Sequence, residues 1–179
     1  MVLDAVEDHV LQKKAVVNIE GRMIKGVNTA KPVVDTIRRR IVQGWSMSNF
    51  LVSSFDMQFL RDIRAEDKQV PVGAILAGEH EPWDIDEATL EMHLREIKDI
   101  QPETVNITLP SLSDRAAGMI RDSGAQPIGW TSREQPPTML LDKEKLKLAR
   151  RLIRNTSVII TDYPGQMRQL LGEYSRLFN

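Results

Sequence analysis

The sequence contains no cysteine among its 179 residues. This absence excludes disulfide bonds, thiolate metal sites and a cysteine nucleophile. The chain also lacks an excess of charge of one sign, since 24 Lys and Arg stand against 25 Asp and Glu. Binding to a phosphate backbone needs clustered cations that outnumber the acids, so no nucleic-acid partner is expected. The short basic stretches at residues 38–40 and 150–154 are predicted to be solvated helix faces.

Long apolar runs are missing as well. No run approaches the 18 or so residues that a membrane-spanning helix needs. The first seven residues include Asp4 and Glu7, whereas a signal peptide begins with basic residues followed by apolar ones. We therefore expect a protein without a membrane span and with a cytoplasmic location.

Several catalytic motifs are absent. There is no glycine-rich phosphate loop of the Walker or dinucleotide type, and the three histidines do not show the spacing of a metal-binding pair. Ser53 and Ser54 lack the flanking glycines of a nucleophile elbow, which argues against a serine hydrolase.

What the sequence does contain is an alternation of aliphatic runs and amphipathic stretches, repeating at intervals of roughly 20 to 35 residues. This rhythm is typical of parallel strands covered by helices. A complete eight-unit barrel takes about 250 residues, so only about six such units fit here. The expected strands are residues 15–19, 50–54, 70–76, 105–109, 127–131 and 157–161. The expected helices include residues 2–11, 31–41, 113–123 and 142–154, with others beginning after Asp56, Asp86 and Tyr163.

In parallel α/β folds, functional groups collect at the carboxyl ends of strands. Glu20 stands at such an end and is suited to ligate a hard divalent cation, although it could equally cap the next element or pair with Arg22. Arg22 either presents its planar fork to a phosphate or is a solvated cation. Trp130 is either a core or barrel-rim residue or a substrate platform. Asp162 is suited to cap the last helix.

Four of these strand ends, taken in order, resemble the later part of the glycerophosphodiester phosphodiesterase family. Residues 17–20 (VNIE) resemble its strand ending in Glu-x-Lys, and residues 52–56 (VSSFD) its Ser-Phe strand. Residues 129–131 (GWT) resemble its Trp-Thr strand, and residues 159–164 (IITDYP) its closing Thr-Asp-x-Pro. Each motif is short, but all four occur in the family's order. An unrelated open α/β domain of flavodoxin-like plan is the alternative.

The resemblance implies a TIM-barrel fold and metal-assisted hydrolysis of glycerophosphodiesters, in lipid metabolism, to glycerol 3-phosphate and an alcohol. It implies that residues 1–179 form one domain, truncated at its N-terminal end relative to the family. It further implies that Glu20 is a ligand of a divalent cation, Ca²⁺ or Mg²⁺. Arg22 takes the catalytic position of the family's lysine, and Phe55 and Trp130 contact the substrate. Because an arginine stays protonated, Arg22 would supply charge and a forked contact rather than transfer a proton.

The family's His-Arg-Gly, Glu-x-Asp and His-Asp motifs, which supply its acid/base histidines and most of its metal ligands, do not occur in this sequence. The fold predicted is therefore an incomplete TIM-type (β/α) barrel of about six βα units that lacks the N-terminal strands. Two hypotheses follow. One is a phosphodiesterase whose missing groups come from elsewhere. The other is a non-catalytic binding or interaction protein. In the second, the open sheet edge is expected to be covered by a partner, a second copy or the N-terminal helix.

Overall fold

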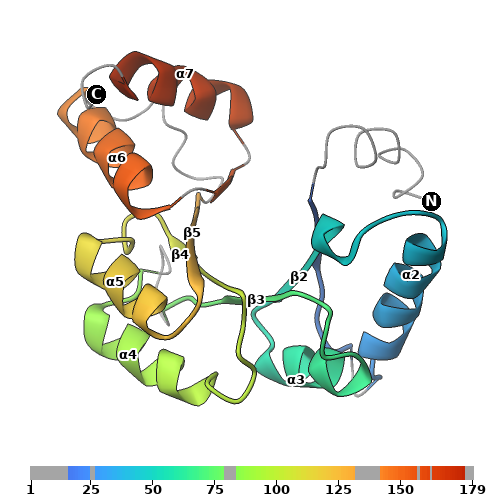
Figure 1. Cartoon of the computed structure of the whole chain (residues 1–179). Coiled ribbons are helices and arrows are strands. Elements are labelled where there is room, and N and C mark those ends of the chain that lie inside the picture. The colour runs from blue at the N-terminus through green and yellow to red at the C-terminus, as the bar shows by residue number, and fades with distance from the viewer. Residues whose placement is uncertain are drawn as a thin grey trace. The chain divides into compact units, whose positions relative to one another are not determined.

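The computed structural model describes residues 16–24, 27–78, 84–131, 142–156, 158–161 and 163–175. In these ranges six strands alternate with helices (Figure 1). The strands are β1 (Val17–Glu20), β2 (Phe50–Ser54), β3 (Val72–Ile75), β4 (Thr104–Thr108), β5 (Gln126–Trp130) and β6 (Ile159–Ile160). The helices are α2 (Ala30–Val42), the 3₁₀ turn η2 (Met47–Asn49), α3 (Met57–Glu66), α4 (Glu87–Glu96), α5 (Asp114–Asp122), α6 (Asp142–Asn155) and α7 (Pro164–Ser175).

The chain divides into two compact units. Unit 1 holds the described residues up to Ile75 together with the segment Asp99–Glu103, and unit 2 holds Leu76–Lys98 and the described residues from Thr104 onward. The single domain predicted over residues 1–179 remains a prediction.

In unit 1, β1, β2 and β3 are parallel neighbours. Glu20 lies opposite Ser53, and Ser53 lies opposite Gly73, so these three residues share one face of the sheet. On the other face, α2 and α3 cover the strands with apolar side chains at helical spacing, because residues three and four apart lie on one side of a helix. Five of the fully buried side chains are Ile37, Phe50, Phe59, Leu60 and Ile63.

Arg64 of α3 joins the segment before β3 to the segment before β4 through hydrogen bonds. Its guanidinium donates to the carbonyl oxygens of Val70 and Ile100, each within 3.1 Å, and to the carboxylate of Glu103 at 2.8 Å. The Glu103 carboxylate in turn accepts from the backbone N–H of Val72 at 2.7 Å. The segment that enters β3 is therefore held by a network of charge-assisted hydrogen bonds.

In unit 2, β4, β5 and β6 are parallel neighbours. Alternation along β4 places Thr104, Asn106 and Thr108 on one face and Val105 and Ile107 on the other. The second face is covered through the segment leading into α5, where Leu109 and Leu112 pack over Gly129; a Cβ at Gly129 would collide with Leu109. The absence of a side chain at Gly129 thus permits close packing of the segment onto β5.

The structure confirms the alternation and most of the expected boundaries. The six expected strands are all present among the described residues, although the last, expected over residues 157–161, covers only Ile159–Ile160. The strand expected to begin at Val70 begins at Val72, because Pro71 has no N–H to donate to a neighbouring strand. The helix expected over residues 2–11 and the capping role of Asp162 lie outside the described residues.

The fold class is confirmed. Six parallel strands alternating with helices are the organisation of an incomplete TIM-type (β/α) barrel. No helix of the described chain is long and apolar enough to cross a membrane.

Candidate functional site

The carboxyl ends of β1 and β2 form a cleft in unit 1. Its volume is about 530 Å³. It is lined by Glu20, Gly21, Arg22, Met23, Phe55 and Asp56. Three of the four residues predicted to form a functional site, Glu20, Arg22 and Phe55, therefore share one cavity.

Hydrogen bonds between the two strand ends fix the floor of this cleft. The Ser54 hydroxyl donates to the carbonyl oxygen of Gly21 at 2.6 Å and accepts from the backbone N–H of Asp56 at 2.8 Å. The Asp56 carboxylate accepts from the backbone N–H of Met23 at 3.1 Å. Its other oxygen caps α3 by accepting from the N–H groups of Gln58 and Phe59, at 3.0 and 3.1 Å. The segment that carries Arg22 is thus held on both sides.

Gly21 is required by close packing. Its φ angle is not in the left-handed region, but a Cβ at this position would lie 2.5 Å from Cζ of Phe59. Phe59 is fully buried in the core of unit 1 and cannot move aside freely. The β1 segment therefore approaches α3 more closely at Gly21 than any residue with a side chain would allow.

Glu20 and Arg22 are both exposed, and both project from the same short segment. Neither the Glu20 carboxylate nor the Arg22 guanidinium has a hydrogen-bond or ion-pair partner among the described residues. The two alternative roles of Glu20, capping the next element or pairing with Arg22, are thus not observed in the described part of the chain. Both charged groups are available to a ligand in the cleft.

Phe55 contributes an apolar wall to the same cleft and is 47% exposed. Ser53 lies beside Glu20 in the β1–β2 register; it is fully buried, and its hydroxyl has no hydrogen-bond partner among the residues that the structure describes. A buried hydroxyl without a partner costs about 1–3 kcal/mol. In the sequence, Ser53 was considered only as part of a strand end that lacks a nucleophile elbow, and its hydroxyl was assigned no binding role, because the burial of this group depends on contacts distant in sequence.

The cleft residues do not by themselves build a site for a divalent cation. A protein site for Ca²⁺ takes six to eight oxygen ligands, and Mg²⁺ is commonly held by one or two carboxylates together with substrate phosphates. Glu20 offers one carboxylate, while both oxygens of Asp56 already accept hydrogen bonds. The described residues contain no group of three or more His, Asp or Glu arranged to hold a metal.

Trp130, the fourth predicted site residue, ends β5 in unit 2 and is 9% exposed. The next residue, Thr131, donates its hydroxyl to that of Thr161 at 2.9 Å, and Thr161 accepts from the N–H of Tyr163 at 3.0 Å. The Trp-Thr and Thr-Asp-x-Pro strand ends are therefore joined to each other, as the two strand ends of unit 1 are. A role of Trp130 in substrate binding remains a prediction.

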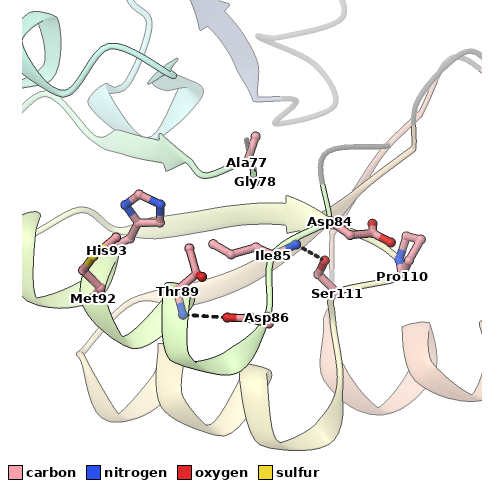
Figure 2. A pocket seen from close by; sticks show the side chains of 10 residues that line it. All are labelled: Ala77, Gly78, Asp84, Ile85, Asp86, Thr89, Met92, His93, Pro110 and Ser111. Atoms are coloured by element: carbon pink, nitrogen blue, oxygen red, sulfur yellow. Dashed lines mark hydrogen bonds between the residues drawn. The ribbon is translucent and has the colours of Figure 1, made fainter. Parts of the chain in front are cut away.

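Unit 2 has a cavity of its own, of about 690 Å³. Figure 2 shows Asp84 and Ser111 on one side of it and Thr89 and His93, which project from α4, on the other. The Ser111 hydroxyl accepts from the N–H of Ile85 at 2.8 Å (Figure 2). The hydroxyl of Thr108, the last residue of β4, donates to the Asp84 carboxylate at 3.0 Å and so connects Asp84 to the end of this strand. Sequence patterns did not predict this cavity, because its polar residues come from α4 and from two loops that are separate in sequence.

The hydrogen bond from the backbone N–H of Thr89 lowers the pKa of Asp86, the residue that caps α4. Asp86, which lines the unit 2 cavity, thus keeps its charge more readily than an ordinary carboxyl group. The only histidine on the described lining, His93, contacts the Glu96 carboxylate through Nδ1 at 3.2 Å.

An incomplete (β/α) barrel with a polar cleft at its strand ends belongs, by architecture, to the TIM-barrel class. Among solved structures, those of glycerophosphodiester phosphodiesterases are similar to it in fold, which confirms at the level of fold the family resemblance found in the sequence.

A structure from Silicibacter pomeroyi, assigned as a glycerophosphoryl diester phosphodiesterase, matches with a TM-score of 0.72 at 15% identity, over 97% of this chain and 55% of that one. An Oleispira antarctica phosphodiesterase in complex with its product sn-glycerol-3-phosphate matches with a TM-score of 0.64 at 17% identity, over 95% and 60%. The Agrobacterium tumefaciens glycerophosphodiester phosphodiesterase matches with a TM-score of 0.57 at 15% identity, over 93% and 60%.

The chain thus spans little more than half the length of these structures. No protein-family model matches the sequence, and no curated protein does.

A substitution at Gly21 tests the architecture of the cleft. Gly21→Ala places a methyl group against the Phe59 ring, and overpacking of this kind costs about 1–3 kcal/mol. We expect a lower midpoint of thermal unfolding, followed by circular dichroism. Gly118→Ala is the matched control, because Gly118 lies within α5 and a Cβ there meets no atom within 4 Å. The control should gain about 0.5–1 kcal/mol from helix propensity. Equal effects at the two positions would contradict the close packing of β1 on α3.

Proposed function

We propose that the cleft of unit 1 binds a glycerophosphodiester and that the chain serves its hydrolysis to glycerol 3-phosphate and an alcohol. The observation that carries this proposal is the meeting of Glu20, Arg22 and Phe55 in one cavity, with both charged groups unpartnered among the described residues. The likeness in fold to glycerophosphodiester phosphodiesterases, one of them bound to sn-glycerol-3-phosphate, supports the choice of substrate.

Three residues of the cleft bind or position the substrate in this proposal. Arg22 binds the phosphate through two parallel N–H donors of its guanidinium, a geometry that matches two phosphate oxygens. Phe55 covers the apolar carbons of the glycerol or of the alcohol. Asp56 positions Arg22 by holding the neighbouring Met23 N–H. Arg22 does not act as a proton donor, because its guanidinium stays charged.

Glu20 is proposed to supply one ligand of a divalent cation, Ca²⁺ or Mg²⁺. Such an ion would neutralise charge that develops on the phosphate oxygens. The other ligands of this ion come, in this proposal, from outside the described residues. The general acid and base of the reaction do so as well, because no histidine is among the described residues that line the cleft. We place the reaction in the turnover of lipid-derived phosphodiesters in the cytoplasm, with Trp130 as a further substrate contact.

Binding of sn-glycerol-3-phosphate tests the role of Arg22. Loss of a charge-assisted hydrogen bond costs about 1.5–3 kcal/mol, so Arg22→Ala should weaken binding about 10- to 100-fold in isothermal titration calorimetry. Arg22→Lys, which keeps the charge, should stay within about tenfold of the parent. Lys68→Ala is the control, since it removes an exposed cation of unit 1 outside the cleft. Equal affinity of the Arg22→Ala and parent proteins would refute the phosphate site.

The same variants separate catalysis from binding. We expect release of glycerol 3-phosphate from glycerophosphocholine or glycerophosphoethanolamine in the presence of Ca²⁺ or Mg²⁺, with kcat/KM reduced by Arg22→Ala. Intact binding without turnover above background would instead support the alternative function, a non-catalytic binding protein.

The role of Glu20 as a ligand of Ca²⁺ or Mg²⁺ is tested by thermal unfolding, which does not require the protein to be active. Binding to the folded state alone raises the unfolding temperature as the concentration of free ligand increases. We expect Ca²⁺ or Mg²⁺ to produce such a shift in the parent and not in Glu20→Gln, a substitution that preserves shape. Glu66→Gln is the control, because Glu66 is an acidic residue of unit 1 that does not line the cleft. Glu103 is not used, because its carboxylate contacts Arg64. A shift unchanged by Glu20→Gln would remove Glu20 as a ligand.

The strand β1 forms an edge of the sheet of unit 1, and this edge is a candidate site for a partner. Within the described residues β1 pairs with β2 alone, and Val16, Ile24 and Val27 nearby are each more than half exposed. An unpaired edge with apolar neighbours is prone to associate with another strand. We propose that a second copy of the chain covers this edge.

Multi-angle light scattering measures this association directly. The expected result is a dimer at micromolar concentration, dissociated by Ile24→Lys, because a buried unpaired cation disfavours the contact. Val42→Lys is the control, since Val42 is 89% exposed on α2. A compact monomer at all concentrations would overturn the dimer.

A further inference from the structure

Helix α6 differs from the rest of the chain in charge. It carries six basic residues and two acidic ones, whereas the whole sequence has 24 basic and 25 acidic residues. The remainder of the protein is therefore net acidic, whereas α6 has four more basic than acidic residues.

Four of the cations form a single stripe along α6. They stand at positions i, i+4, i+7 and i+11 and are all exposed: Lys143, Lys147, Arg150 and Arg154. The stripe extends over about 16 Å of helix. In the described part of the chain, the side chains of Lys143, Lys147 and Arg154 have no hydrogen-bond or ion-pair partner.

The opposite side of α6 is anchored to unit 2. Ala149 and Leu152 are buried, and the Asn155 side chain donates to the Asp114 carboxylate at 2.9 Å and to the carbonyl oxygen of Leu112 at 3.3 Å. These contacts fix the rotation of the helix about its axis. The basic stripe consequently faces away from the core of unit 2.

An apolar residue borders the stripe. Ile153, next to Arg154, is 43% exposed, and Val158, shortly after the helix, is 48% exposed. A helix with cations on its exposed face and an exposed apolar residue at the margin, here Ile153, matches the requirements of a lipid interface, where apolar groups enter between head groups. A nucleic-acid backbone would use the cations but would leave Ile153 in water.

We propose that α6 is a docking surface for an anionic lipid bilayer. Each cation near such a surface strengthens partitioning about fivefold. Four cations give a weak, reversible association, opposed by the net acidic remainder of the chain. Attraction of the four cations to the anionic head groups turns α6 toward the lipid. The proposal does not depend on the proposed hydrolytic function.

Vesicle co-sedimentation tests the docking surface. The purified chain is mixed with vesicles of phosphatidylcholine alone or with 40 mol% phosphatidylglycerol, a composition of roughly this order giving a strongly negative surface. We expect binding only to the anionic vesicles, decreasing as salt is raised because screening shortens the reach of the charges. Equal binding to the two kinds of vesicle would overturn the proposal.

Charge reversals identify the surface. Lys143→Glu combined with Lys147→Glu should lower the partition coefficient at least about tenfold. Lys68→Glu combined with Lys98→Glu makes the same change in net charge at exposed positions outside α6 and should have a much smaller effect. Circular dichroism verifies that all variants keep the parent's helix content.

Two further measurements separate lipid from other anions. Ile153→Ser should weaken vesicle binding at moderate salt, where the apolar contribution persists. A fluorescent single-stranded oligonucleotide serves as the competing polyanion. Tighter binding to the oligonucleotide than to the vesicles, or no effect of the α6 reversals on vesicle binding, would overturn the lipid assignment.

Discussion

The arrangement of the cleft in unit 1 depends on the carboxylate of Asp56. One oxygen caps α3 and the other holds the N–H of Met23, so a single side chain connects the start of a helix to the segment after β1. Ser54 adds a second link between the same two strand ends. Because both oxygens of Asp56 accept hydrogen bonds, this acid builds the cleft, and Glu20 is the acid of the cleft that has no hydrogen-bond partner among the described residues.

The outline of the fold was predictable because it depends on local patterns. Capping by Asp56 and Asp86 and the alternation of apolar strands with amphipathic helices are visible within windows of ten to fifteen residues or so. Counting these units excluded a complete eight-unit barrel, and the family resemblance implied the incomplete one. The exact ends of the strands were less predictable. Strand β6 is shorter than its apolar run, because the extent of its pairing with β5, and not the hydrophobicity of its residues, decides where it ends.

The composition of the cleft was predictable in part. A carboxylate and an arginine at one strand end, and a phenylalanine at the next, were expected to converge because parallel strands end on the same edge. The second contact of Asp56 joins residues 33 positions apart, and the packing of Gly21 on Phe59 spans a similar separation, so neither leaves a mark on any short stretch of sequence. The unit 2 cavity was missed for the same reason.

The contact between Gly21 and Phe59 also couples the two positions in any set of variants. A side chain larger than hydrogen at position 21 requires a smaller one at position 59, because the space is shared. The two substitutions are therefore non-additive, and a change that is harmful alone becomes tolerable beside its compensating partner. A change of the backbone segment between Glu20 and Arg22, whether made in the laboratory or by natural variation, therefore requires a compensating change in the hydrophobic core at Phe59.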